Sequence, residues 1–282
     1  MLDMRYLLVG TTTADLITGG RILGGTVSYA APIVRHFGYQ AHVLTSAHPH
    51  DPLLQGLHDI ADMHVIASEH TTTFENIYTD SGRTQIIHHT AHKLTPVMLP
   101  AEWRSAPLVH LAPLANDVEP LFAHQFEQAT VLLTPQGYMR QWGVDGVVQF
   151  KRFLDNNMLS AIDILVLSKQ DIYDAPELEQ EFPKYTPHVI VTDGENGGTY
   201  YHNGERYHYD AVNVQQVDPT GAGDVFAASL LASLPLLQHN MIAAIKVAAR
   251  LAAHSVTVKG TAIPFTPTFI QQVLDEAMTH HD

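Results

Sequence analysis

Short, strongly apolar runs separated by helix-length segments recur through most of this sequence, and this alternation constrains the fold more than any other feature. The runs are rich in valine, isoleucine and leucine, and they lack the polar alternation of strands with one solvated face. We therefore expect strands that are buried on both faces of a mainly parallel sheet. The expected strands cover residues 5–10, 41–46, 63–67, 108–112, 131–134, 163–168 and 189–192.

Other segments predict hairpins and helices. Residues 71–91 read as a β-hairpin, and so do residues 199–211, which contain Asn203-Gly204, a dipeptide typical of tight hairpin turns. Residues 25–37 predict a helix, and the alanine- and leucine-rich chain after Ala222 is also helical in pattern. In α/β chains of this kind, ligands bind at the carboxyl ends of the parallel strands.

Composition narrows the classes of function. The 15 basic and 29 acidic residues give a net charge of −14, which argues against nucleic acid as a partner, because binding its phosphates requires a basic patch. The absence of cysteine excludes disulfides, thiol nucleophiles and thiolate metal sites. No apolar run approaches the roughly 18 residues of a membrane span, and the N-terminus lacks signal-peptide features. We expect a soluble, cytoplasmic protein with no membrane partner.

The segment with the strongest chemical signal is VDPTGAGD, residues 217–224, which directly precedes a long helical run. Small residues at a helix start let backbone N–H groups converge, and together with the positive end of the helix dipole these groups bind anions. Asp224 falls in the first helical turn, where a carboxylate can accept the proton of an attacking hydroxyl. A simple glycine turn with a dipole-complementing Asp224 explains the same residues, so both interpretations stay open.

The stretch DPTGAGD resembles the C-terminal signature of the ribokinase/PfkB family of sugar and nucleoside kinases. Further landmarks of the family follow in the expected order along nearly the whole chain. They are Asp15 after the first strand, Gly24-Gly25 opening a helix, the TDGENGG segment at 192–198, similar to the family's Thr-x-Gly-x-x-Gly nucleotide loop, and HSVTVKG at 254–260, similar to the stretch that closes its adenine pocket.

This resemblance implies a fold and an activity. The fold would be a single ribokinase-like domain over residues 1–282, a three-layer α/β/α sandwich with a mainly parallel central sheet and a small β lid formed near 11–23 and 71–91. The activity would be transfer of the γ-phosphoryl group of ATP to a hydroxyl of a sugar, cyclitol or related polyol, with Mg²⁺ bridging the phosphates. The GGTVSY sequence at 24–29 is more similar to the inositol-kinase-like branch.

The resemblance also gives each matched position a role. Asp224 would be the general base, and the backbone N–H groups of Gly221, Ala222 and Gly223 would form the anion hole. The other matched residues would bind ligands: Asp15, Gly24, Gly25, Tyr29 and Arg140 the acceptor, Ser168, Asp171, Thr192, Gly194 and Gly197 the ATP, and Asp218 and Thr220 a monovalent cation, usually K⁺.

Two departures from the family pattern bear on these roles. Tyr29 stands where many sugar kinases of the family have asparagine, which makes an ordinary ribokinase assignment doubtful. Ser168-Lys169-Gln170-Asp171 replaces the family's Asn-x-x-Glu motif, so we expect metal use to be retained but altered.

Several alternatives stay open at this point. A nucleoside kinase could use Tyr29 to stack on a base, and a ligand-binding regulator could keep the fold with little or no turnover.

Arg140 could reach a substrate or phosphate, or form a surface ion pair, and Asp117 could face the substrate or cap a helix. A homodimer paired through the lid also stays open, because lid hairpins pair across a dimer in some relatives of the family that this sequence resembles. His88 and His89 would point to opposite faces of a strand, and His280-His281 would lie in a frayed tail, which favours surface histidines over a metal site.

Overall fold

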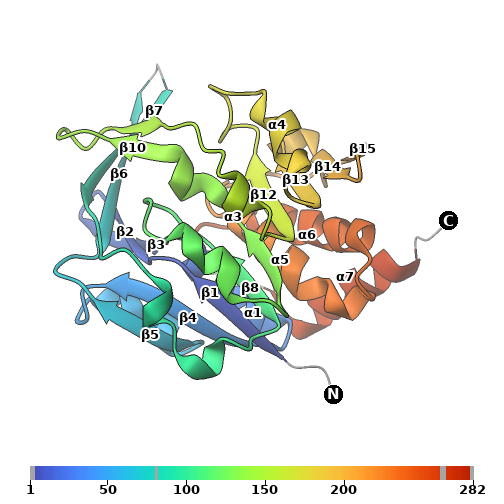
Figure 1. Ribbon diagram of the computed structural model, residues 1–282, viewed down its shortest axis with the longest axis horizontal. Helices are drawn as coiled ribbons and strands as arrows, with labels where there is room; N and C mark the ends of the chain where they lie inside the picture. The colour runs from blue at the N-terminus through green and yellow to red at the C-terminus, as the bar shows by residue number, and fades with distance from the viewer. Residues whose placement is uncertain (1–3, 80–81, 261–264, 280–282) are drawn as a thin grey trace.

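One large sheet runs through the middle of the molecule (Figure 1). The computed structural model describes residues 4–79, 82–260 and 265–279, and within these ranges the sheet has nine strands. The strands are β1 (Arg5–Val9), β4 (Gln40–Ala47), β5 (Asp62–Ala67), β8 (Leu108–Leu111), β9 (Thr130–Leu133), β12 (Ile164–Ser168), β13 (His188–Thr192), β14 (Gly198–His202) and β15 (Glu205–Tyr209). Their order is β15-β14-β13-β12-β9-β8-β1-β4-β5. Only the β13–β14 and β14–β15 pairings are antiparallel.

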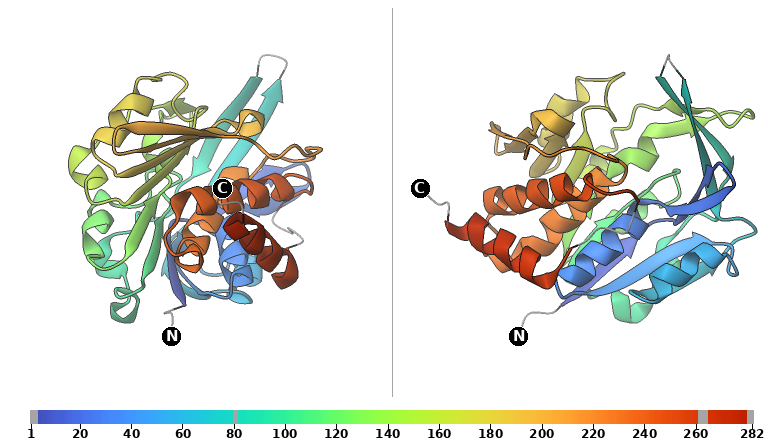
Figure 2. Two further views of the ribbon diagram at one scale, coloured as in Figure 1. Left: turned by 90° about the vertical axis from the view of Figure 1, so that its right-hand side faces the viewer. Right: turned by 180° about the vertical axis from the view of Figure 1, so that it is seen from behind.

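Helices cover both faces of this sheet. One face packs against α1 (Thr26–His36), α5 (Ala222–Ser233), α6 (Met241–Ser255) and α7 (Pro267–Thr279), which lie together in the view from behind (Figure 2). The opposite face packs against the shorter α3 (Asn156–Leu159) and α4 (Leu178–Glu181), while α2 (Gln55–His58) lies beside β5. The predicted three-layer α/β/α sandwich with a mainly parallel sheet is confirmed.

Strand β1 shows why the apolar runs predicted this fold. Tyr6 and Leu8 pack into the core on the α1 and α5 face, whereas Leu7 and Val9 pack into the core on the other face. All four side chains are fully buried. Because each buried leucine or valine contributes about 1.5–3 kcal/mol through the hydrophobic effect, such a strand is stable only between two helical layers.

A second sheet, here named the small sheet, projects from one end of the molecule (Figure 1). It contains β2 (Thr13–Ile17), β3 (Gly20–Gly24), β6 (Thr72–Thr79) and β7 (Gly82–His89) in the order β3-β2-β6-β7. Its buried Phe74 and Ile87 pack against Leu114 and Ala115 of the main body. These strands come from the two segments expected near 11–23 and 71–91, although Asp80 and Ser81 within the second segment lie outside the described residues.

A short two-stranded ribbon was not anticipated from the sequence. It consists of β10 (Arg140–Trp142) and β11 (Val148–Phe150), and the turn that joins them accepts a hydrogen bond from Ile87 N at Gly146 O (2.9 Å). Strands of three residues carry too little hydrophobic periodicity to be recognised in a sequence.

In the described ranges, no helix is both long enough and apolar enough to cross a membrane.

Candidate active site

The first turn of α5 contains the residues that the sequence predicts to bind an anion. Gly221 caps the helix in the left-handed region (φ +81°), a conformation that favours glycine. N–H groups in a first helical turn have no acceptor within the helix. The N–H of Ala222 donates to Pro219 O (3.2 Å), so Gly221 and Gly223 are the better placed donors toward a ligand. The anion hole stays a prediction, in which the N–H groups of Gly221 and Gly223 would contribute more than that of Ala222.

Asp224 lies in this same turn and is only partly exposed. Burial raises the pKa of its carboxyl to about 6, although a hydrogen bond from the Thr26 side chain and the charge of Arg140 oppose the shift. The neighbouring Asp171 carboxylate acts in the same direction as burial. A carboxylate with a pKa near neutrality is suited to take a proton from a hydroxyl, which is the role predicted for Asp224.

Asp15 reaches the same region from β2 of the small sheet. Burial raises the pKa of its carboxyl, while a hydrogen bond from Thr13 Oγ1 (3.2 Å to Oδ1) and the charges of Arg83 and Arg140 lower it. Gly24 leaves room for this carboxylate, because a Cβ at this position would lie 2.7 Å from Asp15 Oδ2. The glycine pair thus lets α1 begin directly beside Asp15.

Arg140 is directed into this cluster rather than onto the surface. Its Nη1 donates to Leu114 O (3.1 Å), and its guanidinium carbon lies 5.6 Å from the centre of the Phe74 ring. Burial lowers the pKa of Arg140 to about 10, and the charges of Asp171 and Asp224 oppose that shift. The sequence left two alternatives for Arg140, and the structure excludes one of them, the surface ion pair.

Gly137 places Arg140. The turn Pro135–Met139 crosses the segment after β8 so closely that a Cβ on Gly137 would lie 2.4 Å from Leu114 N. The N–H of Gly137 donates to Pro113 O (2.9 Å), which fixes the crossing. Any larger residue at this position would displace the start of β10 and with it the guanidinium of Arg140.

The residues predicted for the phosphoryl donor follow strands β12 and β13. Ser168 donates twice to Asp171 Oδ2, from its backbone N and from its Oγ, both at 2.8 Å. Thr192 is the register partner of Ser168 at the ends of these parallel strands, so the two segments lie at one edge of the sheet. An ion pair between Lys169 Nζ and Asp193 Oδ2 (2.7 Å) joins them.

The loop between β13 and β14 depends on its glycines. Gly194 and Gly197 both have positive φ values (+55° and +77°). A Cβ on Gly197 would lie 1.9 Å from Tyr209 O, so only glycine allows the loop to pack against the end of β15. The predicted nucleotide loop is thus packed tightly against the end of β15, and its nucleotide-binding role stays a prediction.

Asp218 and Thr220 form a tight acidic turn before α5. Burial raises the pKa of Asp218, but hydrogen bonds from Thr220 and from the Gly260 N–H outweigh it, and the net pKa is below the usual value. The N–H groups of Val217 and Asp218 also donate to Val256 O (2.7 and 3.0 Å). An ionised carboxylate in this turn is chemically suited to a monovalent cation, and the 254–260 stretch is held beside it.

Three residues of the site were missed or misread in the sequence. Thr26 hydrogen-bonds to Asp224, and Gln136 Nε2 donates to Asp171 Oδ1 (3.1 Å). Asp117 neither caps a helix nor is free to face a substrate, because its carboxylate accepts bonds from Thr11 N and Oγ1 and from the N–H groups at 114 and 115. No local pattern marks these residues, since their partners are distant in the sequence or lie in an irregular turn.

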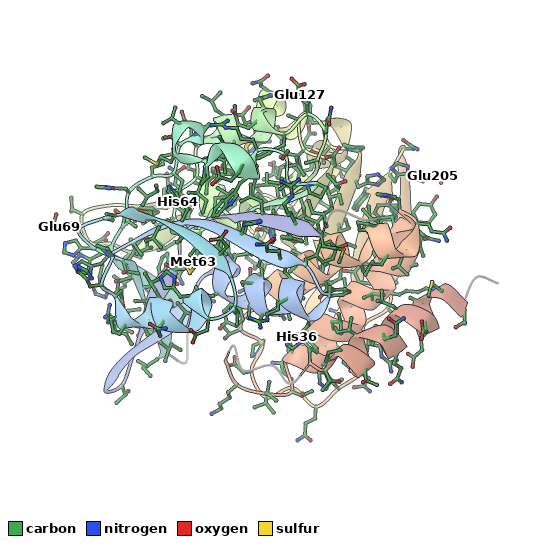
Figure 3. The ribbon with its side chains drawn as sticks, turned by 90° about the horizontal axis from the view of Figure 1, so that it is seen from below. His36, Met63, His64, Glu69, Glu127 and Glu205 are labelled. Carbon is green, nitrogen blue, oxygen red and sulfur yellow. The ribbon has the colours of Figure 1, made fainter. Side chains whose placement is uncertain are left out.

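Five exposed histidines lie near the small sheet, whereas His42 and His110 are buried, against the expectation of surface histidines. The five exposed histidines line a cavity of about 550 Å³ together with Glu69, which lies at the end of the molecule opposite Glu205 (Figure 3). Within the described ranges, no group of three histidine or carboxylate side chains is arranged to hold a metal ion. His280 and His281 lie outside those ranges. The histidines lining the cavity are His48, His50, His70, His88 and His89.

Comparison with known proteins identifies relatives over most of the chain. Residues 158–268 match the model of the pfkB family carbohydrate kinase. Inositol 3-kinase from Zea mays is 28% identical over 251 residues, covering 81% of this chain and 66% of that protein. Fructokinase from Escherichia coli is 27% identical over 187 residues, covering 57% of this chain and 59% of that protein. The matched part of the chain spans less than two thirds of the length of either relative.

Solved structures share the fold at low sequence identity. A sulfate complex of a pyrophosphate-dependent kinase in the ribokinase family superposes with a TM-score of 0.79 at 17% identity, covering 94% of this chain and 99% of that one. Arabidopsis thaliana ribokinase complexed with ribose and ATP gives a TM-score of 0.74 at 20% identity, covering 97% and 99%. The predicted ribokinase-like fold is thereby confirmed.

Proposed function

We propose that this chain, whose residues 158–268 match the model of the pfkB family carbohydrate kinase, transfers a phosphoryl group to a hydroxyl of a sugar, cyclitol or related polyol. The observation that carries the proposal is the arrangement at the start of α5. There the Asp224 carboxyl, with a pKa of about 6, lies in the same turn as the N–H groups of Gly221 and Gly223. A proton acceptor and an anion site in one helical turn are the two elements that phosphoryl transfer to a hydroxyl requires.

The acceptor would lie between the small sheet and α5. Asp15 would accept hydrogen bonds from acceptor hydroxyls, Arg140 would donate to an acceptor oxygen, and Gly24 and Gly25 would allow close approach of the backbone. As the reacting oxygen forms its bond to phosphorus, its proton would pass to Asp224 and the bond to the leaving phosphate would break. The N–H groups at 221–223 would stabilise the charge on the transferring group.

We infer that the donor is ATP. Thr192, Gly194 and Gly197 would line its site, and a cavity of about 430 Å³ lies beside the end of this loop, between the β14–β15 hairpin and helices α6 and α7. Tyr209 packs against Gly197 and also lines the cavity. A mainly apolar, tyrosine-lined cavity suits a nucleobase better than an inorganic donor. Pyrophosphate, the donor named for one of the structural neighbours, is the alternative to be tested.

Two cations would assist the transfer. Asp171, with Ser168 beside it, would help to order Mg²⁺ and its waters, and Asp218 with Thr220 would hold K⁺ or another monovalent cation. When bound, these ions would neutralise phosphate charge during the transfer. The small sheet would act as a lid that excludes water from the reacting groups.

The other functions considered from the sequence are less well supported. The Tyr29 ring is 5% exposed and packs against Gly221, so it is not available to stack on the base of a nucleoside acceptor. A regulator without turnover would have no need for a carboxyl of raised pKa beside an anion site.

The test is the release of ADP in the presence of Mg²⁺ and K⁺ with a panel of sugars, cyclitols and nucleosides, and of phosphate when pyrophosphate replaces ATP. Asp224→Asn should lower turnover by about 10²–10⁴-fold, the usual contribution of a general base. The exposed Asp174→Asn is the matched control and should keep full activity. Near-normal turnover of Asp224→Asn, or no acceptor-dependent signal from the unaltered protein with either donor, would overturn the proposal.

A further inference from the structure

The histidine-lined cavity of about 550 Å³ lies on the outer face of the small sheet, away from the candidate active site. Leu16, Arg21 and Thr73 line the cavity. Asp15 and Phe74 are the chain neighbours of Leu16 and Thr73, and they point to the other face because successive side chains of a strand alternate. The same strands therefore carry Asp15 on one face and the cavity on the other.

A set of hydrogen bonds, here named the latch, holds the small sheet on the main body beside this cavity. Arg21 of β3 donates from Nη1 to Asp51 Oδ2 (3.0 Å) and from Nη2 to Asp51 Oδ1 (3.3 Å). Thr71, which precedes β6, donates from Oγ1 to Asp51 Oδ2 (2.7 Å) and accepts from His48 N (3.2 Å). The segment after β4 is thereby bound both to β3 and to the start of β6.

The latch keeps its charge when histidines titrate. Burial raises the pKa of Asp51, but hydrogen bonds from Thr71, from the Leu53 N–H and from Arg21 outweigh burial, and the net pKa is below the usual value of 3.8. Asp51 is therefore ionised throughout the range from pH 5.5 to 7.5. A pH dependence of small-sheet docking within this range must come from the histidines around the latch.

Two of these histidines are in ring contact at the base of the small sheet. His70 precedes β6 and His89 ends β7, and their ring centroids are 4.2 Å apart with the planes tilted by 30°. Glu69 Oε1 lies 3.7 Å from His70 Nε2, so a first proton on His70 has an acidic partner. A second proton, on His89, would bring two like charges into contact, which is unfavourable.

The other charged groups around the cavity do not offset this second proton. Its carboxylates, among the described residues, already have partners: Asp51 is paired with Arg21, Glu69 lies beside His70, and Glu75 Oε2 is 2.8 Å from His88 Nε2. The remaining groups can only add positive charge, and they are Arg21 and His88 from the small sheet and His48 and His50 from the segment after β4.

We propose that the small sheet is a pH-sensitive element, docked on the main body at neutral pH and released in acid, because the His70–His89 contact at its base cannot hold two protons. Below about pH 6.5, the ordinary pKa of histidine, the undocked sheet binds one proton more than the docked sheet. Falling pH therefore shifts the equilibrium toward the undocked form. Since Asp15 lies on the same strands, release also displaces the acceptor side of the candidate site.

Amide hydrogen exchange of the full chain, followed by NMR, tests the proposal without any activity. The Ile87 N–H, bonded to Gly146 O (2.9 Å), and the His48 N–H, bonded to Thr71 Oγ1, both link the small sheet to other parts of the molecule. From pH 7.5 to pH 5.5, their protection relative to the amides of β1 should fall about three- to tenfold, after correction for the intrinsic pH dependence of exchange. One excluded proton sets the upper value, and solvent screening of the partly exposed rings lowers it. An unchanged relative protection would overturn the proposal.

Variants show whether the His70–His89 contact is the cause. His89→Gln and His70→Gln each remove one of the two protons, so in either variant the fall in protection should be less than twofold. His58→Gln, at an exposed histidine of α2 outside the cavity, is the matched control and should keep the full fall. A full fall in both His89→Gln and His70→Gln would overturn the proposal.

Salt distinguishes charge repulsion from other causes. In 1 M NaCl, the fall in protection of the unaltered protein should shrink to less than twofold, because the repulsion between the two rings is screened. A fall of the same size at low and high salt would overturn the electrostatic cause. The outcome does not depend on the proposed kinase function, since a protein without turnover can be measured in the same way.

Discussion

The ionised carboxylate of Asp224 should destabilise the folded protein, so Asp224→Asn is expected to raise the stability of the protein while it lowers turnover. The carboxyl is only partly exposed, and burial is the main cause that raises its pKa from 3.8 to about 6. A raised pKa means that the folded state holds the proton more tightly than the unfolded state. The stability contributed by this group is therefore present at low pH and is lost as the pH rises from about 4 to about 6.

The size of the effect follows from the pKa shift. A shift of about two units corresponds to about 3 kcal/mol at 1.36 kcal/mol per unit, and this is an upper limit because Asp224 is not fully buried. Asparagine has nearly the same volume, carries no charge and can still accept the hydrogen bond from Thr26. We therefore expect a gain of about 1–3 kcal/mol in the free energy of unfolding at pH 8.

Thermal or urea unfolding of the two proteins at pH 8 and pH 4 measures this gain. Asp224→Asn should melt several degrees higher than the unaltered protein at pH 8, and the difference should shrink at pH 4, where the folded carboxyl is protonated. Asp174→Asn, on the exposed surface, should show no difference at either pH. A variant that is no more stable at pH 8, or one whose gain is the same at both pH values, would refute the reasoning.

Three further outcomes follow from the same structure. Because Asp224 must be ionised to accept a proton, kcat/KM should fall about tenfold per pH unit below pH 6, and a flat profile down to pH 5 would contradict its role as base. Gly197→Ala should destabilise the protein by at least about 2 kcal/mol in urea unfolding, because its Cβ would lie 1.9 Å from Tyr209 O. Gly204 has a similar φ but open space around it, so Gly204→Ala should lower the free energy of unfolding by less. Burial lowers the pKa of His110 to about 3, so as the pH falls the unfolded state binds a proton before the folded state does. The free energy of unfolding should therefore fall by up to about 1.4 kcal/mol per pH unit below pH 6.5. His110→Gln should lack this component of the pH dependence, and an unchanged slope would show that another group causes it.

Much of the fold was predictable because its signals are local. The apolar run of β1 needs burial on both sides wherever it occurs, and the Asn203-Gly204 turn sets the register of its hairpin within a few residues. The start of α5 is equally local, since Gly221, with its positive φ, and the helix that follows it belong to one segment. The strands missed in the sequence, β10 and β11, are held by contacts with the small sheet rather than by their own pattern.

The candidate site was predictable in its residue types but not in its arrangement. The sequence suggested Asp15, Tyr29, Arg140, Asp171 and Asp224 separately, on the basis of motifs. Their roles stay predictions, but their mutual electrostatic influence is a property of the fold, because it depends on distances between segments of five different elements or loops.

The amino-acid sequence by itself thus determined the layers of the sandwich, the glycine turns and the glycine-capped start of α5, because each depends on periodicity or on backbone conformation within one segment. Only the tertiary structure decided that the Tyr29 ring rests on Gly221, that Arg140 turns inward past Phe74, and that burial brings the pKa of Asp224 to about 6. Contacts between distant segments and the loss of solvent around a charge exist only when the chain is folded, and no local pattern encodes them.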